Sequence, residues 1–154
     1  MSSIDERLAE LGVSLPSPSV PAASYVPWRR VGNLVFISGQ IPVKDGQRLY
    51  IGKVGREYTV EQAQDAARLV ALNVLAHVKA ACSGDLDRVV GVVRLGVFVN
   101  CTPEFHQHPM VANGASDLLV QIFGDAGKHT RAAVGAPSLP FDVAVEIDAV
   151  FEVR

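Results

Sequence analysis

Cysteine, aromatic residues and net charge are all scarce in this sequence of 154 residues. It has two cysteines, Cys82 and Cys101, and these cannot build the framework of disulfides that holds small secreted domains together. The net charge of −2 does not favour a nucleic-acid backbone as a partner. No uncharged apolar run approaches the about 18 residues of a membrane-spanning helix, so no membrane partner is expected.

Recognised targeting and catalytic signals are missing as well. The first six residues are acidic and polar, without the basic and apolar regions of a secretory signal, so we expect a cytoplasmic protein. The sequence contains no nucleophile elbow, no phosphate-binding loop and no dinucleotide fingerprint. These absences argue against the common hydrolase, kinase and dehydrogenase classes, and no cofactor is expected.

The sequence is instead rich in apolar residues, which make up 49% of it, against 19% charged residues. The length is that of one globular domain, and we expect a single domain over residues 1–154 in which residues 1–21 form an N-terminal helix and tether. Such an apolar excess in a small domain hints at a second buried surface, such as a subunit interface.

The order of elements predicts an α/β fold of the α+β type, with a mixed sheet and two helices packed on one face. Capping boxes at Ser3–Glu6 and Thr59–Gln62 predict helices over 3–12 and 60–82, and a third helix is expected over 110–123. Residues 14–24 are expected to form an extended tether. Strands are expected at 25–30, 34–37, 49–51, 89–99, 129–136 and 143–153, with a hairpin turn at Gly32-Asn33 and a break at 38–42.

Two helices can cover only one face of such a sheet. By strand alternation we expect the other face to carry Arg94, His129 with Arg131, and Glu146 with Asp148. That face is either solvated or meets another subunit. The almost continuous apolar run over 89–99 favours a subunit, because strands of this kind are usually covered on both faces.

Arg131 is the best candidate for a ligand anchor. Its neighbours Ala132, Ala133 and Gly135 are small and leave a hollow in which a guanidinium can hold a carboxylate through two parallel hydrogen bonds. His129 could line the same hollow or could simply start the strand. The alternative for Arg131 is a surface arginine paired with an acid of a neighbouring strand, such as Asp148.

Glu146 is the best candidate for a general base. A carboxylate in a half-dry site can hold and deprotonate a water molecule. The alternative is a solvated acid on the polar side of a strand.

The remaining candidates are weaker. His106 and His108 lie in a loop without a third ligand, so no metal site is expected. Cys101 shows no adjacent base in the sequence, and His77 is expected to be structural.

Two segments resemble the hallmarks of a known family. The first is Gly32-Asn33-Leu34-Val35-Phe36-Ile37-Ser38-Gly39-Gln40-Ile41-Pro42. The second is Arg131 followed by Leu139-Pro140 and then Val145-Glu146-Ile147-Asp148-Ala149. In this order and spacing they are similar to the Rid (YjgF-like) family of enamine and imine deaminases over about residues 22–153, which includes members described as ribonucleases or translation inhibitors.

The resemblance implies a chorismate-mutase-like fold and a homotrimer with sites in the clefts between subunits. Members with the arginine hydrolyse reactive enamines and imines, such as 2-aminoacrylate, to 2-oxo acids and ammonia without a cofactor. Carried over by position, Arg131 would hold the carboxylate of a small imino or keto acid, and Glu146 would position the attacking water. Tyr25, Ser38 and Gly39 would line the pocket.

The sequence also departs from the best-known members. Ala133 stands where many members have a cysteine that acts partly through its backbone. Asn113 is the best match to the family's pocket asparagine. The helix over 3–12 and the loop over 100–108 look like features of a subgroup. A non-catalytic trimer that binds small carboxylates or keto acids, with a regulatory or interaction role, is the alternative. The acidic net charge argues against ribonuclease activity. The presence of Glu146 beside Arg131 in the motif favours a deaminase, because a pure binder needs the arginine but no acid to act on water.

Overall fold

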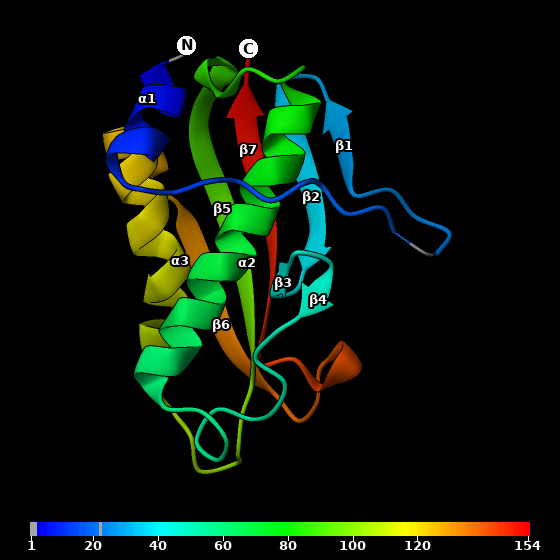
Figure 1. Ribbon diagram of the computed structural model, residues 1–154, viewed down its shortest axis with the longest axis vertical. Coiled ribbons are helices and arrows are strands. Elements are labelled where there is room, and N and C mark those ends of the chain that lie inside the picture. Colours follow the sequence, from blue (N-terminus) through cyan, green and yellow to red (C-terminus); the bar gives the residue numbers. More distant parts are fainter. Residues whose placement is uncertain (1–2, 22) are drawn as a thin grey trace.

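A computed structural model describes residues 3–21 and 23–154, which form a five-stranded mixed sheet with helices on one side and a small two-stranded sheet (Figure 1). The elements are α1 (Ser3–Glu10), β1 (Trp28–Val31), β2 (Leu34–Gln40), β3 (Val43–Lys44), β4 (Gln47–Arg48), α2 (Val60–Ala81), β5 (Val89–Asn100), α3 (His108–Phe123), β6 (Thr130–Ala136) and β7 (Val145–Val153). The five-stranded sheet has the order β1-β2-β7-β5-β6, with β5 and β6 parallel and the other neighbours antiparallel. The expected mixed sheet of the α+β type is confirmed.

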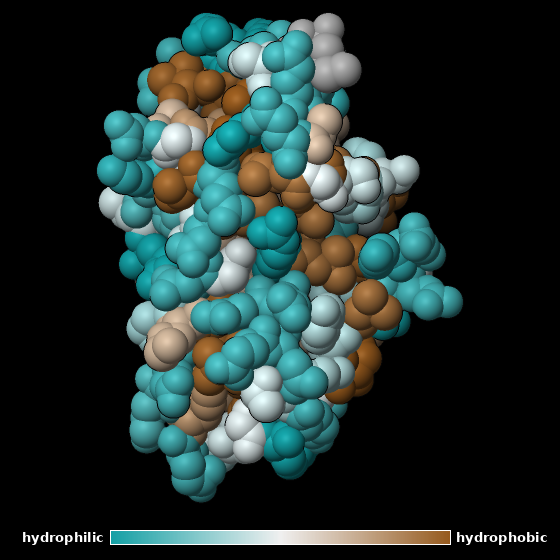
Figure 2. Space-filling view, turned by 60° about the vertical axis from the view of Figure 1, so that its left-hand side comes forward, coloured by the Kyte–Doolittle hydropathy of each residue, from teal (hydrophilic) through white to brown (hydrophobic). Residues whose placement is uncertain are grey.

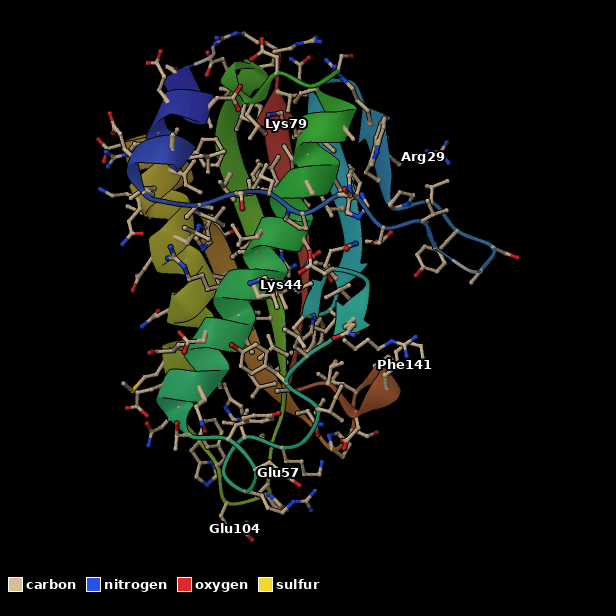
Figure 3. All side chains as sticks on the ribbon, in the orientation of Figure 1. Arg29, Lys44, Glu57, Lys79, Glu104 and Phe141 are labelled. Carbon is tan, nitrogen blue, oxygen red and sulfur yellow. The ribbon has the colours of Figure 1, made fainter. Side chains whose placement is uncertain are left out.

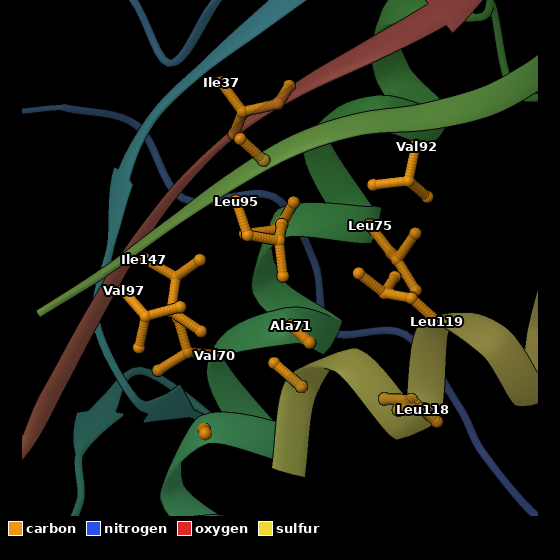
Figure 4. Packing of buried hydrophobic residues seen from close by; sticks show 14 of the residues in the cluster. Ile37, Val70, Ala71, Leu75, Val92, Leu95, Val97, Leu118, Leu119 and Ile147 are labelled. Carbon is orange, nitrogen blue, oxygen red and sulfur yellow. The ribbon is translucent and has the colours of Figure 1, made fainter. Parts of the chain in front are cut away.

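The helices α2 and α3 cover one face of the sheet, and the core lies between the two layers. Leu75 of α2 and Leu119 of α3 meet Val92 and Leu95 of β5 in this layer (Figure 4). The outer side of the helices, seen from the α1 and α3 side, is mostly hydrophilic with smaller hydrophobic patches (Figure 2). Among the described residues, no helix is long and apolar enough to cross a membrane.

The two capping boxes behave differently. The box at Thr59 is confirmed: its hydroxyl accepts from the Gln62 backbone N–H at 3.2 Å, and the Gln62 side chain accepts from the Thr59 backbone N–H at 2.9 Å. The box at Ser3 is wrong, because Ser3 already lies inside α1, where its backbone N–H and hydroxyl both donate to the Asp87 carboxylate. The start of α1 is therefore fixed by a distant part of the chain.

Several strand boundaries differ from expectation, and the final strand begins at Val145 rather than at residue 143. β1 begins at Trp28 rather than at residue 25, and β2 continues to Gln40 through a register shift instead of breaking at residue 38. The strand expected at 49–51 is wrong, since Asp45-Gly46 forms a two-residue turn with positive φ at both positions. Such a turn pairs the residues that flank it directly, which places the strand at Gln47–Arg48.

Candidate functional site

Arg131 lies on β6, the edge strand, and faces α3. In the parallel ladder it pairs with Leu95, whose side chain is buried beneath the helices. Its Nη1 donates to Asn113 Oδ1 at 2.8 Å and to Ser116 Oγ at 3.1 Å, and both partners belong to α3. The guanidinium is nevertheless exposed, so it is held by the helix while staying open to a ligand.

This placement corrects the expectation that Arg131 shares the open face of the sheet with Arg94 and Glu146. Alternation fixes which residues of a strand share a side, but the small residues of β6 give no apolar pattern that tells which side meets the helices. The alternative pairing of Arg131 with Asp148 is also wrong. Asp148 accepts instead from Arg94 at 3.3 Å, on the open face.

His129 belongs to the same group as Arg131, although it precedes the strand. Its Nε2 lies 2.9 Å from Ser116 Oγ, and its Nδ1 lies 2.6 Å from the Gly127 carbonyl oxygen. We call Asn113, Ser116, His129 and Arg131 the arginine half-site. Ala133 lies two residues further along the same side of β6, where it pairs with Val97.

Glu146 lies on the opposite face of the sheet. It pairs with Phe98 in β5, whose side chain points to the face without helices. Burial, together with the nearby charge of Asp148, raises the pKa of the Glu146 carboxyl. A carboxyl group with a raised pKa is suited to proton transfer near neutral pH.

The backbone of Gly39 lies against that carboxylate. A Cβ atom at position 39 would collide with Glu146 Oε2, so only glycine leaves the acid in place. The Ser38 hydroxyl donates to the Val26 carbonyl oxygen at 2.7 Å and holds the segment that carries Tyr25. We call Tyr25, Ser38, Gly39 and Glu146 the glutamate half-site.

The glutamate half-site opens into a broad hollow of about 1410 Å³. Tyr25, Ile51 and Phe141 line it with partly exposed apolar side chains. Phe141 projects outward from the loop before β7 (Figure 3), and the Arg48 guanidinium lies 3.5 Å above its ring. The hollow that Glu146 lines therefore also carries apolar surface and the Arg48 guanidinium.

The structure thus brings the sequence-predicted residues together in two groups rather than one. Asn113, the best match to the family's pocket asparagine, accepts a hydrogen bond from Arg131. Glu146 gathers with Gly39 and Tyr25 around the hollow. The sheet separates the two groups, so Arg131 and Glu146 of one chain do not face a common ligand.

Sequence reasoning missed two contacts. Ser116 was not anticipated, and the only signal was its position three residues after Asn113, on one side of α3. The expectation that no base adjoins Cys101 is wrong, because its Sγ lies 3.3 Å from His108 Nε2. Burial raises the pKa of the Cys101 thiol, which disfavours its thiolate form.

The remaining histidine candidate and the metal-site prediction concern residues outside the two half-sites. His77 is buried in α2, with Nε2 3.3 Å from the Ser19 hydroxyl, and burial lowers its pKa. In the part of the chain that the structure describes, no group of three or more His, Cys, Asp or Glu residues is placed to hold a metal ion.

Comparison with known proteins identifies the family. The model described as "YjgF/chorismate_mutase-like, putative endoribonuclease" matches residues 5–152. The protein TCP17 of Trypanosoma cruzi is 46% identical over 149 residues, which are 96% of this chain and 92% of that protein. A solved structure of a protein of unknown function from Agrobacterium tumefaciens is 48% identical, with a TM-score of 0.92 over 98% of this chain and 92% of that one.

A more distant solved structure is described as containing a bound ligand. It is that of TdcF from E. coli with bound serine, which is 27% identical with a TM-score of 0.63 and covers 92% of this chain and 95% of that one. The family model spans nearly the whole sequence, and the relatives agree with it in both sequence and fold. This chain belongs to the YjgF/chorismate mutase-like family.

Proposed function

We propose that this protein is a hydrolytic deaminase that converts reactive enamines and imines of small amino acids into 2-oxo acids and ammonia. We further propose that it acts as a homotrimer with its sites between subunits. The observation that carries both statements is the separation of Arg131 from Glu146 by the sheet. A ligand held by an arginine and served by a carboxylate must then lie between two copies of the chain.

The face of the sheet without helices supports the oligomer. Leu34 and Phe36 of β2, Phe98 of β5 and Val134 of β6 are large apolar side chains on that face, and each is exposed in the single chain. Exposed apolar surface of this extent is typical of an interface between subunits. Contact there would bring the β6 edge of one chain toward the hollow of the next.

The proposed reaction depends mainly on holding the imine carbon and a water molecule in the right positions. Arg131 holds the carboxylate of the imino acid, which fixes the imine carbon in front of a water molecule. Glu146 accepts a proton from that water as its oxygen bonds to the carbon, and then gives this proton to the imine nitrogen. In the resulting carbinolamine the C–N bond breaks, the hydroxyl proton passes to the leaving nitrogen, and the products are ammonia and the ketone.

A second candidate is a non-catalytic trimer that binds small carboxylates or keto acids. The bound serine named in the structure of TdcF favours it, because serine is a small carboxylate without a reactive imine. Ribonuclease activity, which the family description names, is not favoured by a net charge of −2.

A coupled assay separates the two candidates. An amino-acid oxidase generates imines in situ, and the release of 2-oxo acid is timed with the wild type, Arg131→Ala and Glu146→Gln, with Arg56→Ala as a surface control. A deaminase accelerates release, and both site variants lose the acceleration while the control keeps it. If the wild type accelerates no imine but binds 2-oxo acids, the binder replaces the enzyme.

A further inference from the structure

The α3 helix engages only one nitrogen of the Arg131 guanidinium. Nη1 carries two hydrogens, and both are directed to α3, one to Asn113 Oδ1 and one to Ser116 Oγ. Nε and Nη2 have no hydrogen-bond partner among residues 3–21 and 23–154. These two nitrogens form the edge of arginine that binds a carboxylate through two parallel hydrogen bonds. The contacts with α3 therefore turn the carboxylate-binding edge outward.

The direction of each hydrogen bond in this group follows from its end points. A guanidinium only donates, so Ser116 Oγ accepts from Arg131 and keeps its own hydrogen for another acceptor. The Gly127 carbonyl only accepts, so the His129 Nδ1 at 2.6 Å must carry the ring hydrogen. Nε2 of the neutral ring is then an acceptor, and it lies 2.9 Å from Ser116 Oγ. The hydrogen bonds therefore run in a consistent order: Arg131 donates to Ser116, Ser116 donates to His129, and His129 donates to the Gly127 carbonyl.

Two groups in this series of hydrogen bonds lie in close packing. Gly127 is buried against the last turns of α3, where a Cβ atom would collide with the Leu119 carbonyl oxygen. Ser116 is nearly buried in α3, where its hydroxyl has little access to water as a substitute partner. His129 links the Gly127 carbonyl to Ser116, and Ser116 in turn contacts the exposed arginine.

We propose that Ser116 and His129 are positioning residues that orient Arg131 for a planar anion, and that His129 does so as the neutral Nδ1–H tautomer. The inference rests on the proposed function in one respect, namely that Arg131 binds a carboxylate. It deepens that function by assigning ligand selectivity to the pair: ligands with a carboxylate depend on them, and ligands without one do not.

The test compares four variants in calorimetric titrations with 2-oxobutanoate, and with 2-butanone as the ligand that lacks a carboxylate. Ser116→Ala and His129→Ala each weaken 2-oxobutanoate binding roughly tenfold, the usual effect of losing about one hydrogen bond to a charged group. His129→Gln, whose longer side chain can accept from Ser116, stays within about threefold of wild type. His129→Asn reaches only the Gly127 carbonyl and behaves like His129→Ala. Affinity for 2-butanone is unchanged throughout.

A second measurement needs no ligand and no activity. Nitrogen NMR of the wild type shows His129 with its hydrogen on Nδ1, and rotation of the Arg131 guanidinium becomes faster in Ser116→Ala. A hydrogen on Nε2 overturns the inference, as does a guanidinium whose rotation is the same in both proteins.

The two proposals fail separately. If wild type hydrolyses imines and Ser116→Ala and His129→Ala equal it in both affinity and rate, the positioning role is overturned and the deaminase stands. If wild type hydrolyses no imine but binds 2-oxobutanoate in a way that depends on Ser116 and His129, the deaminase fails and the positioning role stands.

Discussion

The two half-sites hold their charged groups by different means. Arg131 is exposed but fixed by side chains of α3, and its charge does not depend on pH in the physiological range. Glu146 is half-buried beside the bare backbone of Gly39, and its charge state is set by burial and by Asp148. Hydrogen bonds hold the arginine half-site in place, whereas burial determines the properties of the carboxyl group in the glutamate half-site. A site that joins them would combine a permanent anchor with a tunable base.

Removal of the anchor should have the largest effect. In the proposed site Arg131 makes two charge-assisted hydrogen bonds to the ligand carboxylate, each contributing about 1.5–3 kcal/mol, so Arg131→Ala should lower kcat/KM for imino acids roughly 10²–10⁴-fold. Arg131→Lys keeps the charge but cannot form the paired bonds, and it recovers only part of the loss. Steady-state kinetics with each variant measures both. A lysine variant equal to wild type would mean that charge alone matters.

The anchor also shows where sequence reasoning reaches its limit. The helix over 60–82 was predicted because its capping box and its stripe of small residues are local, and Glu146 was placed on the polar side of an alternating strand for the same reason. The side of the sheet that Arg131 faces was mispredicted, since β6 is built of residues too small to show an inside and an outside. The role of Ser116 depends on how α3 is rotated against β6, which no single segment encodes.

Displacement of the base should have the next largest effect. Gly39→Ala places a methyl group against Glu146 Oε2 and pushes the carboxylate out of position. We expect kcat to fall roughly 10–10²-fold, less than the about 10²–10⁴-fold that a general base usually contributes, because the carboxylate is displaced and not removed. KM should change little, because in the proposed site Arg131 holds the ligand carboxylate. The double variant Gly39→Ala with Glu146→Asp shortens the acid and should recover part of kcat. A rise in KM alone would place Gly39 in ligand binding instead.

The pH dependence should belong to the glutamate half-site alone. Burial and the charge of Asp148 raise the pKa of Glu146 above that of an ordinary glutamate, so kcat/KM should fall as pH drops through the raised pKa and the carboxylate becomes protonated. Arg131→Lys keeps this acidic limb, whereas Glu146→Gln loses it together with most of the activity. Rate profiles over acidic to neutral pH measure the limb. A limb that survives in Glu146→Gln would belong to another group.

The same shift makes a prediction for stability, with its sign fixed by linkage. A carboxyl group whose pKa is higher in the folded than in the unfolded state destabilises the fold above the folded pKa, and this cost disappears as pH falls toward the unfolded value. Glu146→Gln should therefore raise Tm slightly at neutral pH, and the gain should vanish in acid. Thermal unfolding at several pH values, with Glu152→Gln as an exposed control on the same strand, tests this.

The smallest effect on kcat/KM is expected from substitution of Cys101. This substitution tests whether the arginine half-site extends as far as Cys101. The Cys101 thiol faces His108 beside Gly135, four residues beyond Arg131 on the same side of β6. Because burial raises its pKa, the thiol is a poor nucleophile at neutral pH, and Cys101→Ser should leave kcat/KM within about twofold of wild type. Alkylation by iodoacetamide should be slow at both Cys101 and Cys82, whose thiol pKa burial also raises. If Cys101 instead reacts much faster than Cys82, and its loss lowers kcat/KM, then His108 activates the thiol and the arginine half-site extends to the end of β6.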